Sequence, residues 1–133
     1  MKQIEVSAAI ILNGEKILCV QRNENKYQYL SLKYEFPGGK LEPGESKENA
    51  VIREIHEELN LDINIIEEYL TVFHQYPDFK ITMYSFLCNC TDISTLNLKE
   101  HIDYKWSDRA QLLNLDWAEA DLPIVNKLIG LTI

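Results

Sequence analysis

Cysteine is scarce, and its spacing does not favour a structural role. The 133-residue sequence has three cysteines, Cys19, Cys88 and Cys90, and no C-x-x-C pair. An odd number in so short a chain is a poor disulfide framework. We therefore expect reduced thiols and a cytoplasmic protein.

Long apolar runs and linkers are also missing. The stretch Val6 to Leu12 is interrupted by Ser7 and stopped by Asn13-Gly14, which makes it too short and too polar for a signal peptide or a membrane span. No repeat, low-complexity tract or Gly/Ser linker divides the sequence. We expect one domain over residues 1–133.

Positive charge is in deficit. Lys and Arg number 13 against 21 Asp and Glu, which gives a formal net charge of -8. Nucleic-acid backbones and anionic membranes need clustered Lys and Arg, so neither is an expected partner. Any phosphate ligand needs another source of positive charge. With 46% hydrophobic residues, the chain can still bury the core of one domain.

The remaining residues predict strands combined with a few helices. Asn13-Gly14 lies between two β-rich runs and favours a tight hairpin turn. Residues 23–33 are polar and tyrosine-rich without a clear period, which indicates a loop. The expected strands are 4–12, 17–21, 63–75, 80–90 and 104–106.

Near the C-terminus, Ser107 is expected to cap a short helix. Asp121 and Pro123 are expected to begin a last helix that stops at Gly130. Strands with a central helix and a terminal helix predict an α+β fold, a mixed sheet in an α/β/α sandwich.

The central helix is expected to start after Ser46 as N-cap and to end near Leu59. At 100° per residue, Val51, Ile52, Ile55 and Leu59 form a stripe suited to packing on a sheet.

Glu54, Glu57 and Glu58 fall in the neighbouring sector, at the i, i+3, i+4 spacing that stacks side chains on one helix face. They can be an ordinary solvated face, because like charges at this spacing cost only a few tenths of a kcal/mol. They can also be a site for a hard cation such as Mg²⁺ or Mn²⁺, which takes oxygen ligands. Periodicity alone does not choose between these interpretations.

The wider spacing favours the cation site. The charged and small residues of this region have a fixed order: Gly39, Glu45, Arg53, Glu54, Ile55, Glu57, Glu58 and Leu61. This order resembles the Nudix box, the signature of the Nudix hydrolases, G-x5-E-x7-R-E-U-x-E-E-x-G-U, where U is aliphatic. The one departure is Asn60 in place of Gly, and Asn is the second choice for the left-handed residue that ends a helix.

The resemblance covers nearly all of the chain. Tyr34 to Lys40 looks like the E-F-P-G-G-K entry of the MutT-like branch, and Tyr76 to Phe86 is similar too. Enzymes of that branch hydrolyse nucleoside triphosphates to the monophosphate and diphosphate with Mg²⁺ and so clean the nucleotide pool. The resemblance implies the Nudix fold, with the mixed sheet between the catalytic helix and the C-terminal helix. Whether the protein is a monomer or a homodimer stays open.

The resemblance also implies the metal ligands and the base. Glu54, Glu57 and Glu58, with Glu100 and the carbonyl of Gly38, are expected to hold the cation. Glu54 is the first choice for the general base and Glu100 the second. Glu100 matches a loop glutamate of the branch, and without the resemblance it would count as an exposed loop carboxylate.

Arg53 is expected to orient a carboxylate such as Glu45 in support of the metal ligands. A surface salt bridge from Arg53 to Glu57 is the alternative and does not exclude this role.

Apart from Asp121, three further residues match the branch's substrate site. Arg22 and Lys40 are the expected phosphate contacts, although either could be an ordinary surface cation. Glu35 is expected to bind substrate as part of the E-F-P-G-G-K match.

Asp121 aligns with the base-reading asparagine of members that prefer 8-oxo-guanine. An ionised aspartate only accepts hydrogen bonds, which suits the amine of cytosine, and Ala120 to Pro123 looks like the CTP pyrophosphohydrolase-type members. A protonated Asp121 or a differently placed oxidised guanine also fits, and Asp121 could instead only cap the last helix. Cytidine-type and oxidised-purine triphosphates are therefore competing substrates.

Two other functions compete with triphosphate hydrolysis. Pro77 lies where ADP-ribose hydrolases carry a proline, but a hairpin turn explains it equally well. A non-catalytic nucleotide-binding module is disfavoured because the box glutamates are all present.

Overall fold

The computed structural model describes residues 1–130, and its centre is a seven-stranded mixed sheet. The strands are β1 (Lys2–Asn13), β2 (Lys16–Gln21), β3 (Tyr34–Glu35), β4 (Gly38–Lys40), β5 (Ile63–Gln75), β6 (Phe79–Cys90) and β7 (Asp103–Ser107). The α-helices are α1 (Lys47–Leu59) and α2 (Leu122–Leu128), and the 3-10 helices are η1 (Arg109–Asn114) and η2 (Glu119–Asp121).

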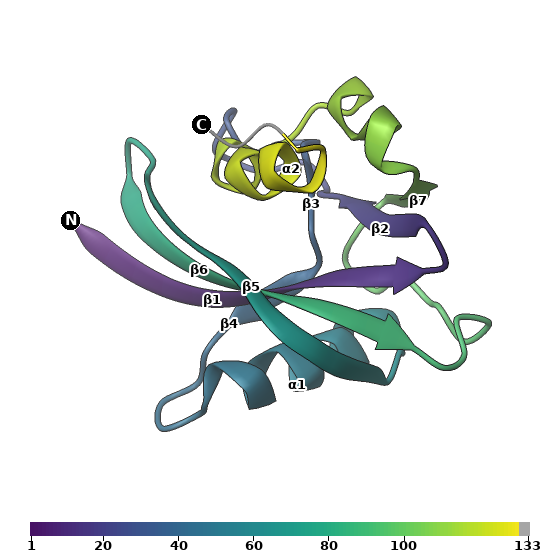
Figure 1. The fold of residues 1–133 in the computed structure, drawn as a ribbon. Coiled ribbons are helices and arrows are strands. Elements are labelled where there is room, and N and C mark those ends of the chain that lie inside the picture. Colours follow the sequence, from purple (N-terminus) through teal and green to yellow (C-terminus); the bar gives the residue numbers. More distant parts are fainter. Residues whose placement is uncertain (131–133) are drawn as a thin grey trace.

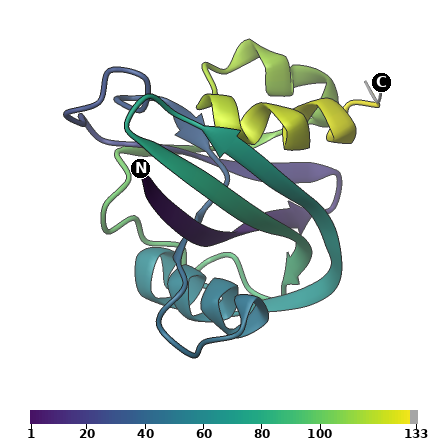
Figure 2. The ribbon, with the colours of Figure 1, turned by 90° about the vertical axis from the view of Figure 1, so that its left-hand side faces the viewer.

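The strand order is β3-β2-β1-β6-β5, with β4 paired to β1 and β7 paired to β2. β1 and β6 are parallel, and the other pairs are antiparallel. Helix α1 covers one face of the sheet and α2 the other (Figures 1 and 2). The expected α+β sandwich is confirmed.

The first hairpin forms where the sequence predicted it. Asn13 pairs with Lys16 across the turn, and Gly14 has a φ of +60°, a left-handed conformation that glycine adopts without a steric penalty. β1 lies in the interior of the sheet, because its other edge pairs with β6.

Both predicted ends of α1 are confirmed. The Ser46 hydroxyl accepts a hydrogen bond from the Asn49 amide at 3.1 Å. Asn60 closes the helix with a φ of 56°, and its amide donates to the His56 carbonyl. Ile52 was wrongly included in the buried stripe, since it is 40% exposed and Ala50 is buried instead.

Two apolar cores lie on opposite faces of the sheet. The core under α1 packs Val51, Ile55 and Leu59 against strand residues that include Ile11 and Phe86. The other core packs the buried face of α2, Ile124, Val125 and Leu128, against strand residues that include Ile10 and Met83. Each helix is therefore fixed on the sheet by its own apolar stripe.

The C-terminal region differs in detail from the prediction. Ser107 is the last residue of β7 and caps no helix, because Asp108 precedes η1 and the Ser107 hydroxyl donates to the Asp108 carbonyl. Helix α2 ends at Leu128, two residues before Gly130, which has a φ of +86°. Asp121 precedes α2 but makes no side-chain cap.

Among the helices of residues 1–130, none has the length and apolar character needed to cross a membrane.

Candidate active site

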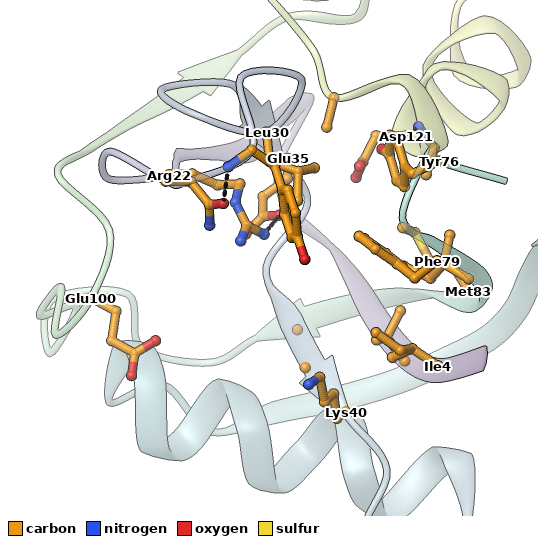
Figure 3. A pocket seen from close by; sticks show the side chains of 18 of the residues that line it. Ile4, Arg22, Leu30, Glu35, Lys40, Tyr76, Phe79, Met83, Glu100 and Asp121 are labelled. Carbon is orange, nitrogen blue, oxygen red and sulfur yellow. Dashed lines mark hydrogen bonds and ion pairs between the residues drawn. The ribbon is translucent and has the colours of Figure 1, made fainter. Parts of the chain in front are cut away.

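A cleft of about 1050 Å³ opens between the α1 side and the α2 side of the molecule. Most of the residues predicted from the sequence line it: Arg22, Glu35, Gly38, Lys40, Glu54, Glu58, Glu100 and Asp121. Figure 3 shows Lys40 and Glu100 toward the α1 end, with Asp121 and Tyr76 beside α2. The end beside α1, lined by Glu54, Glu58 and Glu100, is called the acidic end. The second end lies near α2.

Three predicted residues, Arg53, Glu45 and Glu57, are not among those that line the cleft, but Arg53 contacts the lining residue Glu54. The Arg53 guanidinium donates to both carboxylate oxygens of Glu45, at 2.7 and 2.9 Å. It also donates to Glu54 at 2.9 Å, to Glu57 at 3.1 Å and to the Lys40 carbonyl at 3.1 Å. The predicted contact with Glu45 and the alternative contact with Glu57 are both present.

The consequence for Glu45 is electrostatic. Hydrogen bonds from Arg53, assisted by the backbone amide of Glu42, lower the pKa of Glu45 to about 2. Glu45 is thus a fixed anion that holds the guanidinium in place.

Glu54 and Glu58 face the cleft from α1. The Glu54 carboxylate lies against Gly39, where a Cβ would fall 2.3 Å from the carboxylate carbon. Burial, followed by the negative charge of Glu100 and a smaller effect of Glu54, raises the pKa of Glu58 to about 7, although His101 acts in the opposite sense. Negative charge is therefore concentrated at this end of the cleft, where Glu54, Glu58 and Glu100 all line the wall.

As the side chains stand in residues 1–130, no three His, Cys, Asp or Glu groups converge closely enough to hold a metal ion. Glu54 and Glu57 are instead both hydrogen-bonded to Arg53. The donor chemistry nevertheless fits a hard cation, since Glu54, Glu58 and Glu100 supply oxygen ligands at one end of the cleft and Glu58 is destabilised in its ionised form.

Glu35 lies further along the cleft, held between the side chains of Arg22 and His101. Arg22 Nη1 lies 2.9 Å from one of its oxygens and His101 Nε2 lies 2.9 Å from the other. Burial alone would raise the pKa of Glu35, but the hydrogen bond to His101 and the charge of Arg22 outweigh it and lower the pKa. The hydrogen bond to Glu35 thus fixes the orientation of the Arg22 guanidinium. Lys40, the other predicted phosphate contact, is exposed.

Asp121 is 2% exposed and accepts a hydrogen bond from the Phe36 amide at 3.0 Å. The interpretation of Asp121 as a helix cap is therefore wrong. Burial, followed by the negative charge of Glu35, raises the pKa of Asp121 well above its ordinary range. This favours a protonated carboxyl, which both donates and accepts hydrogen bonds.

Sequence reasoning missed an aromatic wall. Tyr27, Tyr76 and Phe79 line the cleft, and Tyr29 stacks on Tyr27 and Tyr76 with centroid distances of 5.2 and 4.9 Å. The Tyr29 hydroxyl donates to Asp78 at 2.7 Å and so ties the 23–33 loop to the β5–β6 hairpin. The tyrosine-rich composition of that loop was the available signal.

Comparison with known proteins identifies the family. The NUDIX domain model matches residues 1–128. The chain therefore belongs to the Nudix hydrolases, which act on phosphoric anhydrides and generally use divalent metals.

The relatives are MutT-like. The CTP pyrophosphohydrolase of Escherichia coli (strain K12) is 34% identical, over 98% of this chain and 95% of the relative. The 8-oxo-dGTP diphosphatase of the same strain is 29% identical, over 96% of this chain and 98% of the relative. The solution structure of DNA mismatch repair protein MutT from methicillin-resistant Staphylococcus aureus 252 is 38% identical, with a TM-score of 0.76, 97% of this chain covered and 98% of that chain.

Gly38→Ala and Gly39→Ala are expected to have different effects. A Cβ at Gly38 would meet the Ser7 carbonyl oxygen of β1 at 1.9 Å, a backbone clash, so the free energy of unfolding should fall by at least about 2 kcal/mol. A Cβ at Gly39 would meet only the movable Glu54 carboxylate, so that variant should fold but turn over substrate at least about tenfold more slowly.

Urea unfolding and steady-state turnover of both variants measure this difference. Wild-type turnover in Gly39→Ala would show that the position of Glu54 does not matter to catalysis.

Proposed function

We propose that the protein is a Mg²⁺-dependent nucleoside triphosphate pyrophosphohydrolase, with Mn²⁺ as a possible substitute. It converts a (d)NTP and water to the (d)NMP and diphosphate in the nucleotide pool. The observation that carries the proposal is the polarity of the cleft, whose acidic end lies opposite an aromatic wall and a buried Asp121. A triphosphate and a base need these two environments.

The acidic end is assigned to the phosphates. Glu54, Glu58 and Glu100 would hold the cation, joined by Glu57 once it leaves Arg53, with the Gly38 carbonyl as a further ligand. A bound divalent cation would supply positive charge to the triphosphate and lower the pKa of an attacking water. Lys40 and Arg22 are the proposed phosphate contacts.

Glu54 is the proposed general base, with Glu100 as the second candidate. Arg53 holds one Glu54 oxygen at 2.9 Å, which restrains the carboxylate beside Gly39. Because Arg53 is itself anchored by both oxygens of Glu45, we assign Arg53 and Glu45 to positioning the base.

The second end is assigned to the base, with Tyr27, Tyr76 and Phe79 as apolar walls and Asp121 and Glu35 as polar groups. A protonated Asp121 offers a donor as well as an acceptor, so it suits an oxidised guanine as well as cytosine. The relatives named CTP pyrophosphohydrolase and 8-oxo-dGTP diphosphatase support cytosine-type and 8-oxo-guanine triphosphates equally.

Pro77 lies between β5 and β6 and is accounted for by that hairpin.

A panel of CTP, dCTP, 5-methyl-dCTP and 8-oxo-dGTP, assayed for diphosphate release with Mg²⁺, tests the proposed function. We expect turnover of at least one of the four, with the monophosphate as the other product and loss of activity in EDTA. Binding of a triphosphate without any turnover would instead indicate a non-catalytic module.

Asp121→Asn and Asp121→Ala test base reading. An amide keeps a donor and an acceptor, so Asp121→Asn should keep the order of preference within the panel. Asp121→Ala should lose about tenfold in kcat/KM for the preferred base, the size of one hydrogen bond in a buried site.

The kcat/KM ratio between bases is the quantity to compare, because Asp121→Ala also leaves the Phe36 amide unpaired. An unchanged ratio in Asp121→Ala would mean that another residue reads the base.

A further inference from the structure

His101 has no role in the site assigned above, yet its side chain is only 7% exposed and lies between the two ends of the cleft. It belongs to the segment 91–102 between β6 and β7, directly after Glu100. Figure 3 shows Glu35 beside Arg22 and Glu100 on a separate segment. His101 is the residue that connects them.

One imidazole nitrogen is bonded to the Arg22–Glu35 pair. His101 Nε2 lies 2.9 Å from one Glu35 oxygen, while Arg22 occupies the other. Each oxygen of the partly buried Glu35 carboxylate therefore has its own partner, which fixes its orientation.

The second nitrogen is directed toward α1. His101 Nδ1 is buried without a hydrogen-bond partner in residues 1–130, and it lies 4.0 Å from a Glu58 oxygen. An unpaired buried nitrogen is costly, so its place beside Glu58 calls for a functional reason.

The backbone around Glu100 has few other attachments. The Lys99 amide donates to the Glu58 carbonyl at 3.3 Å, and the Ile102 amide donates to the Gln21 carbonyl at 3.0 Å. The Glu100 side chain itself is exposed. Before Glu100 the segment is held by Leu98, which packs against the core under α1, and directly after Glu100 it is held by the inward-facing His101 ring.

We propose that His101 is a positioning residue that joins the Arg22–Glu35 pair to the segment bearing Glu100, so that Glu100 stays opposite Glu58 at the acidic end. The proposal deepens the proposed function and rests on it for the role of Glu100. Removal of the imidazole should lower kcat more than it changes KM, because the aromatic wall, Asp121 and the Arg22–Glu35 bond remain.

Three substitutions separate the two nitrogens. In His101→Gln the amide nitrogen takes the approximate place of Nε2 and keeps a donor to Glu35, whereas the shorter side chain of His101→Asn ends near the place of Nδ1. We expect His101→Ala and His101→Asn to lose about tenfold or more in kcat. KM should change by less than about threefold, and His101→Gln should keep about half of the wild-type kcat. His56→Ala, on the exposed face of α1, is the control and should behave as wild type.

Amide hydrogen exchange of Lys99 and Ile102, measured without nucleotide, gives a readout independent of turnover. Protection should fall in His101→Ala and His101→Asn and persist in His101→Gln. The proposal is overturned if His101→Ala keeps wild-type kcat and protection, or if His101→Gln is impaired as much as His101→Ala. If the wild type turns over no triphosphate, the proposed function fails, and the exchange comparison alone decides the positioning role.

Discussion

The guanidinium of Arg53 is the interaction on which the acidic end of the cleft depends. It binds both oxygens of Glu45, one oxygen each of Glu54 and Glu57, and the carbonyl of Lys40. A single side chain thereby joins strand β4, the turn before α1 and two turns of α1 itself. Only a planar fork with several donors can serve these partners together, so lysine is not an equivalent replacement. Because the hydrogen bonds from Arg53 lower the pKa of Glu45 to about 2, the Glu45–Arg53 ion pair persists throughout the neutral pH range.

The sequence predicted features that depend on local chemistry, such as the Asn13-Gly14 hairpin, the Ser46 cap and the left-handed Asn60. The spacing of the carboxylates was also predictable, since helical geometry fixes it. The failures depend on contacts between distant segments. Asp121 lies at the start of the last helix, so a cap was a possible interpretation. Its actual partner, the Phe36 amide, lies 85 positions away, and no local pattern could reveal that contact. The aromatic wall likewise combines the 23–33 loop with the β5–β6 hairpin, and no local pattern reports that pairing.

The proposed function requires an acidic chain to bind a triphosphate, and the distribution of charge along the cleft bears on this requirement. The formal net charge is -8, and at the α1 end of the cleft burial, followed by the negative charge of Glu100, raises the pKa of Glu58 to about 7. In the proposed function, a divalent cation would relieve the repulsion between Glu58 and Glu100 and attract the phosphates. At the other end, burial favours a neutral Asp121, so a base bound there would meet a hydrogen-bonding group without full charge. The pair of Glu35 with Arg22, held by His101, lies between these regions.

Thermal unfolding of Glu58→Gln with and without Mn²⁺ at pH 8 tests the central claim, that a cation relieves carboxylate repulsion. Because the pKa of Glu58 is raised, its ionisation lowers the stability of the folded state as the pH rises through about 7. Without metal, Glu58→Gln should therefore melt at or above the wild-type Tm. Saturating Mn²⁺ should raise the Tm of the wild type and of Glu48→Gln, a control at the start of α1, but raise that of Glu58→Gln much less. An equal rise in Glu58→Gln, or no rise in the wild type, would contradict the account.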